Sequence, residues 1–303
     1  MMKTIGIAGG SGFVGRHIAP LLVQEGFEVI IFSRGKAKQE GKIQFANWHP
    51  EKKEIDETAL AKVQAMINLA GAGVTTQRWT DAYKKEIISS RVDATHFLQD
   101  ALRKHAPECT TYIATSATGF YGPDRPDSIP FKEEAPPYSD FLGEVCRLWE
   151  EASWQASAVY RTVIFRLGIV LGKDGGAYPE LSGPMKFGVM PIIGGGRQMV
   201  SWIHVDDVVR MMQYALDNEK LSGIYNAVSP EPISHKALMQ AIASAKGGLK
   251  IPVPVPGFGL KILMGESSIE VLKSCTASAE KISDAGFKFS FPTIQKATKA
   301  LAL

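Results

Sequence analysis

The sequence predicts an α/β fold with a second, smaller lobe towards the C-terminus. Strand-like apolar segments alternate with amphipathic, helix-like segments over most of the first 231 residues. The first of these strands runs directly into a glycine-rich turn that opens a helix. After Gly172 the composition shifts to glycine, proline and methionine. A chain of 303 residues also exceeds a typical single domain, so we expect about two lobes.

The glycine-rich turn lies in TIGIAGGSGFVGR, from Thr4 to Arg16, between a predicted buried strand and a predicted helix at 16–24. Gly9 permits the tight turn, Gly12 lets backbone N–H groups approach a pyrophosphate, and Gly15 lets the helix pack closely on the strand. The N-terminus of the helix favours an anion. The turn therefore predicts a nucleotide site; the alternative is a turn that binds nothing.

The second strand is expected at Phe27–Phe32, and Ser33, Arg34, Gly35 and Lys36 follow it. In dinucleotide-binding folds a carboxylate at this place binds the ribose 2′-hydroxyl, whereas an arginine accommodates a 2′-phosphate. Neither Asp nor Glu occurs in these four residues. They favour NADP over NAD, and the alternative is a solvated basic turn.

Other elements follow from the same patterns. The strand at 63–73 ends in Ala70, Gly71 and Ala72, which either admit a cofactor or form a tight strand exit. Arg166 interrupts another buried strand and needs a partner or a phosphate. The remaining segments are strands at 43–47, 111–117, 162–172 and 223–228, a helix from about Asp56, one long helix at 78–102, a helix capped by Ser139 and a helix capped by Asp206 or Asp207.

Hydroxyl side chains gather at the end of the strand at 111–117, in Thr115, Ser116 and Thr118. Side chains at the carboxyl end of a central strand point into the crevice where ligands of such sheets bind. His204 lies beside a predicted helix start. A structural role is the favoured interpretation of this histidine, and a functional one is the alternative.

The composition excludes several classes of function. A net charge of +3 is too small to indicate a nucleic-acid or membrane partner. Cys109, Cys146 and Cys275 are far apart, odd in number and without metal spacing, which indicates a reducing compartment. The first apolar run lacks the layout of a signal peptide, and no run approaches the length of a membrane span. We expect a cytoplasmic protein with a small-molecule substrate and no metal; a homodimer stays open.

The assembled motifs resemble the extended short-chain dehydrogenase/reductase superfamily, of the NAD-dependent epimerase/dehydratase type. More closely, the chain is similar to the atypical subgroup of epimerase-family proteins of unknown substrate with a C-terminal domain of unknown function. The motifs that carry the resemblance are GGSGFVG at Gly9, FSR at Phe32, INLAGAG at Ile67, RW at Arg78 followed by KKEIISSR, TSATGFYG at Thr115, FLGEVCRLWE at Phe141, FRLGIVLG at Phe165, WIHVDDVV at Trp202 and AGFKFSFP near the C-terminus.

This resemblance implies a doubly wound parallel sheet of the Rossmann type that binds NADP. The implied cofactor domain comprises residues 1–172 and 200–231, and the substrate lobe comprises 173–199 and 232–303. The lobe would close a cleft over the nicotinamide. The implied cofactor contacts are Gly9, Gly12, Phe13, Val14 and Gly15 at the pyrophosphate, Ser33 and Arg34 at the adenosine ribose, and Leu69, Ala70, Glu86, Arg91 and Val170 elsewhere.

The catalytic motif departs from the superfamily. Its members use a Tyr-x-x-x-Lys pair, in which the ammonium depresses the pKa of the tyrosine. Alignment of FLGEVCRLWE places Leu142 and Cys146 at these positions, and no tyrosine of the chain has a lysine four residues on. In the absence of this pair, Ser116 is the candidate that orients a substrate, and Thr118 is its alternative. Tyr121 or water is the candidate for proton transfer.

Two functions therefore stay open. One is an NADP-dependent oxidoreductase or epimerase-type enzyme for a small substrate with a hydroxyl or carbonyl group. The other is a non-catalytic NADP-binding redox sensor or interaction module.

Overall fold

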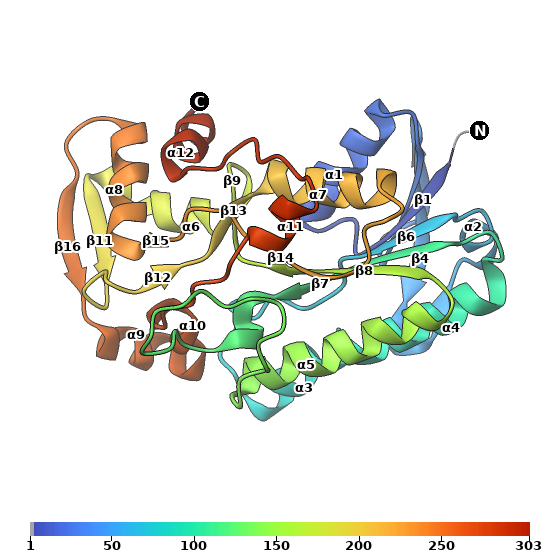
Figure 1. Ribbon diagram of the computed structural model, residues 1–303, viewed down its shortest axis with the longest axis horizontal. Coiled ribbons are helices and arrows are strands. Elements are labelled where there is room, and N and C mark those ends of the chain that lie inside the picture. Colours follow the sequence, from blue (N-terminus) through green and yellow to red (C-terminus); the bar gives the residue numbers. More distant parts are fainter. Residues whose placement is uncertain (1–2) are drawn as a thin grey trace.

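A large, mostly parallel sheet forms the centre of the molecule (Figure 1). The structure is a computed structural model that describes residues 3–303, apart from the side chain of residue 263. The strands lie in the order β14-β8-β7-β6-β1-β2-β4-β3, and only β3 and the short β5 run antiparallel to β4. Their bounds are β1 Thr4–Ala8, β2 Glu28–Ser33, β3 Lys38–Glu40, β4 Ile43–His49, β5 Glu54–Ile55, β6 Ala65–Asn68, β7 Thr111–Ala117, β8 Arg161–Leu167 and β14 Gly223–Ala227.

Helices cover both faces of this sheet, which confirms the predicted fold class (Figure 1). One face buries its apolar side chains under α1 (Phe13–Gln24), α7 (Val205–Asp217) and α11 (Glu280–Asp284). The other face packs against α2 (Glu57–Leu60) and α4 (Val92–His105), with α5 (Phe141–Trp154) beside α4. This layering explains why the central strands read as continuous apolar runs.

Two predicted segments are broken in the structure. The single helix expected at 78–102 is wrong, because α3 (Asp81–Ser89) ends and α4 begins on either side of Arg91. The strand expected at 162–172 divides into β8 and β9 (Ile169–Gly172). Gly168 separates the two strands. The backbone of Ser201 lies so close to it that a Cβ on Gly168 would be 2.6 Å from the carbonyl oxygen of Ser201.

Two predicted helix caps are also wrong. Asp140, not Ser139, caps α5 by accepting a hydrogen bond from Gly143 N at 2.7 Å. His204, rather than Asp206 or Asp207, caps α7, because its Nδ1 accepts from the backbone N–H of Asp206 at 3.1 Å. A buried ring thus replaces the usual short polar cap.

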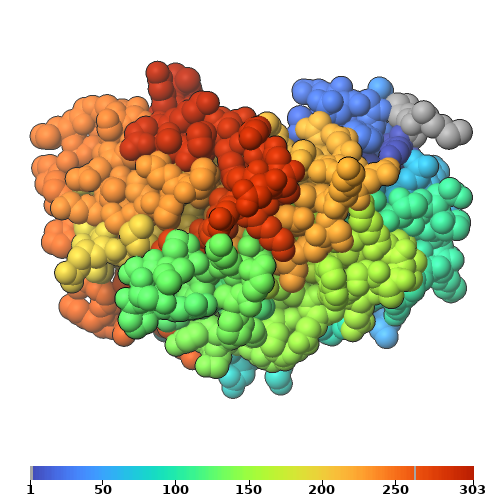
Figure 2. All heavy atoms as spheres, viewed as in Figure 1, coloured from blue at the N-terminus to red at the C-terminus, as the bar shows by residue number. Residues whose placement is uncertain are grey.

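Residues after Gly172 and after 232 form a second hydrophobic core at one end of the molecule (Figure 1). Short strands from distant parts of the sequence pair there, and the final residues run across both parts of the molecule (Figure 2). No helix among the described residues is long and apolar enough to cross a membrane. The elements are β10 Gly175–Gly176, α6 Tyr178–Ser182, β11 Val189–Ile193, β12 Met199–Val200, β13 Trp202–His204, β15 Ile233–Ser234, α8 His235–Lys246, β16 Ile251–Val255, α9 Gly257–Met264, α10 Ile269–Leu272 and α12 Ile294–Ala302.

Candidate functional site

The glycine-rich turn has the geometry of an anion cradle. Gly9 follows β1 with a φ of +74°, in the left-handed region that favours glycine. Gly12 caps α1 without any side-chain hydrogen bond, so the first backbone N–H groups of the helix keep their capacity for a ligand. A Cβ on Gly15 would lie 2.2 Å from the carbonyl oxygen of Gly10, which shows how closely helix and turn pack.

A cavity of about 640 Å³ opens beside this turn, at the carboxyl ends of β1, β2 and β6. Ligands of doubly wound sheets bind at this edge. Seven of the predicted cofactor residues line the cavity, so distant parts of the sequence meet there as expected. They are Gly9, Gly12, Ser33, Arg34, Leu69, Ala70 and Glu86.

Five other predicted cofactor residues are not part of the cavity lining. The ring of Phe13 packs against Gly172 and Gly175, where a Cβ on either glycine would lie only 2.4 Å from a ring atom. Val14 and Val170 pack against the main hydrophobic core, and Gly15 packs on the turn. The fifth residue, Arg91, lies directly behind the lining.

Arg91 is a half-buried cation held by backbone carbonyls. Its guanidinium donates to the oxygens of Ala72 at 2.9 Å and Ile87 at 3.1 Å, and it lies 5.0 Å from the ring centre of Trp149. Its Cζ is 3.1 Å from the place that a Cβ on Gly71 would take, and Gly71 lines the cavity. Desolvation lowers the pKa of this arginine.

The sequence did not indicate other residues of the lining, which lie at or just after the end of β4, or between the end of α3 and the first turn of α4. Glu51 brings a carboxylate near Arg34, and a hydrogen bond with its own backbone lowers its pKa, helped by the charges of His49 and Arg34. The pairing of β4 with β2 would have indicated this neighbourhood, but register is not visible in one sequence. The missed lining residues of these two regions are Trp48, Pro50, Glu51, Ser89, Ser90, Asp93 and Ala94.

The two residues predicted for catalysis lie in a buried polar network instead of the cavity. Ser116 Oγ donates to Glu150 Oε1 at 2.7 Å. Tyr121 OH donates to Asn226 Oδ1 at 2.6 Å and accepts from Arg166 Nη1 at 2.8 Å. Both side chains are 2% exposed. Their catalytic role stays a prediction, and this burial weighs against it.

Arg166 and Glu150 form the centre of that network. Arg166 donates to both carboxylate oxygens of Glu150, at 2.8 and 2.7 Å, and to the backbone oxygen of Glu133 at 2.9 Å. Its guanidinium also lies 3.6 Å from the ring centre of Phe120. Burial raises the pKa of Tyr121 despite Arg166, so its phenol stays protonated. The partner that the sequence required for Arg166 is therefore internal.

The two positions that align with the Tyr-x-x-x-Lys pair of the superfamily carry an apolar and a neutral side chain. Leu142 and Cys146 are 5% and 4% exposed. Burial raises the pKa of the Cys146 thiol to about 12, so it stays neutral near pH 7. No cluster of three or more His, Cys, Asp or Glu side chains in the described part of the chain is arranged to hold a metal ion.

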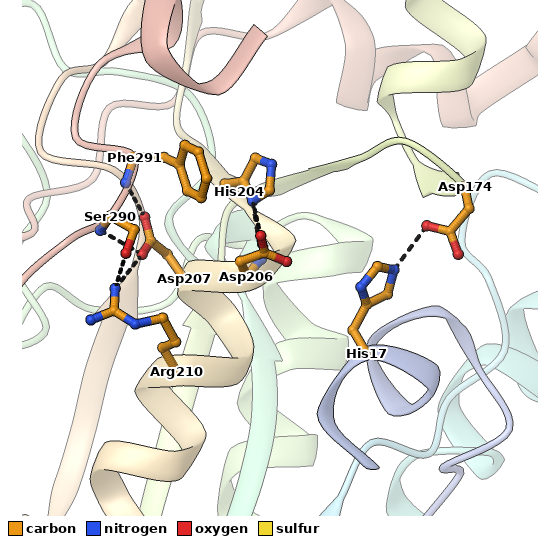
Figure 3. Close-up of polar contacts among 8 residues, drawn as sticks. All are labelled: His17, Asp174, His204, Asp206, Asp207, Arg210, Ser290 and Phe291. Atoms are coloured by element: carbon orange, nitrogen blue, oxygen red, sulfur yellow. Dashed lines mark hydrogen bonds and ion pairs between the residues drawn. The ribbon is translucent and has the colours of Figure 1, made fainter. Parts of the chain in front are cut away.

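The WIHVDD segment fastens the C-terminal residues to α7 (Figure 3). Asp207 is fully buried and accepts from the backbone N–H groups of Ser290 and Phe291, both at 2.8 Å. The ring of His204 stacks on Phe291 with 3.9 Å between centroids. Desolvation lowers the pKa of His204, so the ring is neutral. These contacts support the structural interpretation of this histidine.

Comparison with sequence families gives two matches in this chain. Residues 5–227 match the NAD dependent epimerase/dehydratase family, and residues 255–301 match a domain of unknown function, DUF1731. Epimerase family protein YfhF of Bacillus subtilis is 35% identical over 98% of this chain and 97% of its own length. Mouse epimerase family protein SDR39U1 is 30% identical over 97% of each chain.

Solved structures share the fold over the whole chain. Human epimerase family protein SDR39U1, crystallised with NADPH, has a TM-score of 0.87 and 26% identity, covering 99% of both chains. A nucleoside-diphosphate sugar epimerase from Corynebacterium glutamicum has a TM-score of 0.78 and 30% identity, covering all of this chain and 58% of the other. A UDP-glucuronic acid 4-epimerase from Bacillus cereus, 18% identical with a TM-score of 0.80, shares the fold.

Proposed function

Because the chain belongs to the NAD dependent epimerase/dehydratase family, we propose that it binds NADP(H) in the cavity beside the glycine turn. We further propose that it acts as an oxidoreductase or epimerase-type enzyme on a small substrate with a hydroxyl or carbonyl group. Residues 1–172 and 200–231 would hold the cofactor, and residues 173–199 and 232–303 would cover the substrate.

The observation that carries the cofactor proposal is the position of Arg34. It follows Ser33 at the end of β2 and lines the cavity that contains the glycine turn. A guanidinium there favours a 2′-phosphate. The NADPH in the structure of the human relative supports the same choice. Glu51 also lines the cavity and is the rival group, since a carboxylate would favour a ribose 2′-hydroxyl.

The other residues fit the same ligand. The uncapped N-terminus of α1 and the N–H groups around Gly12 would bind the pyrophosphate, and Leu69 and Ala70 would let the cofactor lie against the end of β6. Glu86, Arg91 and Val170 are assigned to it by family resemblance. A bound nicotinamide would supply or accept a hydride, and the chain would orient the substrate and move its proton.

Calorimetric titration with NADPH and NADH tests this proposal. A charge-assisted phosphate contact contributes about 1.5 to 3 kcal/mol, so Arg34→Ala should lose roughly ten- to a hundredfold in NADPH affinity and little in NADH affinity. Lys36→Ala is the matched control, because Lys36 is exposed and outside the cavity lining. Glu51→Gln should not weaken NADPH binding. Equal affinities of the unmodified protein for both nucleotides would refute the choice of NADP.

A non-catalytic NADP-binding protein is the second candidate. The apolar Leu142 and neutral Cys146 favour it, because neither transfers a proton near pH 7. Oxidation of NADPH by the purified protein in the presence of small aldehydes, ketones and quinones separates the two candidates. Consumption above the rate of NADPH alone supports the enzyme, and its absence with every carbonyl supports the binding protein.

A further inference from the structure

A carboxylate and an ammonium group meet in the C-terminal segment without any assigned function. Glu270 lies in α10, and Lys273 directly follows it. Their side chains are only 18% and 7% exposed, and Lys273 Nζ lies 2.5 Å from Glu270 Oε1. Within the described residues, neither atom makes a hydrogen bond of regular geometry. Buried charges with unused hydrogen-bonding capacity are candidates for a functional site.

The segment that carries the pair lies near the first half of α5 and contacts the turn after β7. Glu270 acts electrostatically on Cys146 in α5, on Cys275 in its own segment and on Asp140, the cap of α5. Cys275 Sγ donates to the backbone oxygen of Thr118 at 3.5 Å. A Cβ on Gly119 would lie 3.8 Å from Cys146 Sγ. Glu270 therefore lies near the carboxyl edge of the main sheet.

Arg91 lies near both Gly71, which lines the cavity, and Cys146. Its guanidinium lies directly behind Gly71 in the cavity lining, and its charge also acts on Cys146. Glu270 acts on the same thiol from the C-terminal segment. Arg91 and Glu270 thus both lie near Cys146, close to the sheet edge where ligands bind.

The segment that carries Glu270 is fastened across the molecule to α3. Arg78, just before α3, donates to the backbone oxygen of Ile262 in α9. Lys84 of α3 forms an ion pair with Glu266, in the turn between α9 and α10. Figure 1 shows α9 and α10 together below the second core. These contacts hold α10 against the part of the chain that carries the cavity.

We propose that Glu270 is the acid/base residue of this site and that Lys273 positions it. The inference rests on the proposed function, with a reduced nicotinamide nucleotide as the hydride donor. In carbonyl reduction a hydride from the reduced nicotinamide would bond to the carbonyl carbon as the carbon–oxygen π bond opens. The O–H bond of the Glu270 carboxyl breaks, and its proton bonds to the substrate oxygen. The electrons of the O–H bond stay on Glu270, which becomes a carboxylate beside the Lys273 ammonium. In the reverse direction that carboxylate takes the hydroxyl proton.

The electrostatic surroundings suit this role. Burial raises the pKa of Glu270 above its ordinary 4.5, the nearby Lys273 ammonium lowers it, and Asp140 raises it further. The carboxyl acts electrostatically on Cys146 and Cys275, but burial raises their thiol pKa values to about 12, so they carry no competing charge. A carboxyl with a raised pKa is a better proton donor near neutral pH than an ordinary one is, because more of it is protonated.

The first test follows the carboxyl itself in the full-length protein. Side-chain ¹³C resonances of labelled glutamate are titrated, and Glu270→Gln identifies the signal of Glu270. The expected midpoint lies above 4.5, and Lys273→Met should move it higher, whereas Lys273→Arg should restore it. A midpoint at or below 4.5, or one that Lys273→Met leaves in place, would overturn the assignment.

The second test uses NADPH oxidation with phenanthrenequinone, a reducible dicarbonyl, and a panel of small aldehydes. Glu270→Gln should lower kcat by about 10²- to 10⁴-fold without changing NADPH affinity, and Glu270→Asp should keep part of the rate. The unmodified protein should lose rate as pH rises through the Glu270 pKa, and Glu270→Gln should lose this dependence. Glu280→Gln is the control, because Glu280 forms an exposed pair with Lys132.

The outcomes distinguish the role of Glu270 from the proposed enzymatic function. An active unmodified protein with an equally active, folded Glu270→Gln variant would refute the role of Glu270 and leave the proposed function intact. No NADPH oxidation by the unmodified protein with any probe would refute the proposed enzymatic function, and the role of Glu270 with it. If Glu270→Gln lost circular dichroism signal, Glu270→Asp and the titration of the unmodified protein would decide.

Discussion

Replacement of Glu150 by Gln should be the most destabilising conservative change in the polar network beneath the sheet edge. Glu150 is 6% exposed and accepts three hydrogen bonds, one from Ser116 and two from Arg166. The variant keeps the shape of the side chain but leaves the guanidinium, which is 2% exposed, without a counter-charge. The perturbation is therefore almost purely electrostatic.

Breaking a buried ion pair by removing one charge costs about 3 to 5 kcal/mol. Arg166 keeps the Tyr121 hydroxyl, the Glu133 carbonyl and the face of Phe120, so we expect the lower half of this range. A folded protein has only about 5 to 15 kcal/mol of stability, so even this loss is large.

Urea unfolding followed by far-ultraviolet circular dichroism measures the loss, as a lower midpoint with an unchanged slope. Glu144→Gln is the matched control on the same helix, because it breaks only an exposed pair with Arg147 and should change little. The double variant Glu150→Leu/Arg166→Met should recover most of the stability, since neither charge of this pair then stays buried. A loss below about 1 kcal/mol in Glu150→Gln would refute the reasoning.

Three further predictions follow from the site and its surroundings. Gly12→Val should abolish NADPH binding but leave the protein folded, because a Cβ at Gly12 meets only the carbonyl oxygen of Gly9, at 3.2 Å. The control is Gly183→Ala, which should bind NADPH normally because no atom lies within 4 Å of a Cβ at Gly183. Calorimetry measures binding and circular dichroism measures folding for both variants. Tyr121→Phe should lower stability by about 0.5 to 1.5 kcal/mol without changing kcat, and a large fall in kcat with intact stability would return Tyr121 to the mechanism. Burial lowers the pKa of His204 below 6.5, so the folded protein should lose stability as the pH falls below 6.5, by up to about 1.4 kcal/mol per pH unit. His204→Asn keeps a helix cap and should make the stability less dependent on pH, as measured by denaturant titrations at several pH values.

Local patterns in the sequence predicted the nucleotide end of the molecule well. The strand at Thr111–Ala117 has the predicted bounds, and the glycine turn lies between β1 and α1 as expected. Both depend on signals within a few residues: buried runs, glycines at fixed spacing and a helix start. The break at Arg91 and the cap at His204 were not predictable in this way. Arg91 is held by carbonyls of two segments, and His204 is held by Phe291, far along the chain.

The position of Ser116 shows how a buried charge determines where a hydroxyl at the end of a strand points. Ser116 and Asn226 are the register partners of Arg166 on the strands either side of β8, so the three residues form one row across the sheet. A buried arginine in such a row must be neutralised, and Glu150 of α5 does this from the covering helix. Once Glu150 is there, the Ser116 hydroxyl bonds to it instead of pointing into the crevice. The charge of Arg166 therefore decides where its neighbours point, and under the proposed function a proton-transfer group outside this row, such as Glu270 of the C-terminal segment, would serve the substrate.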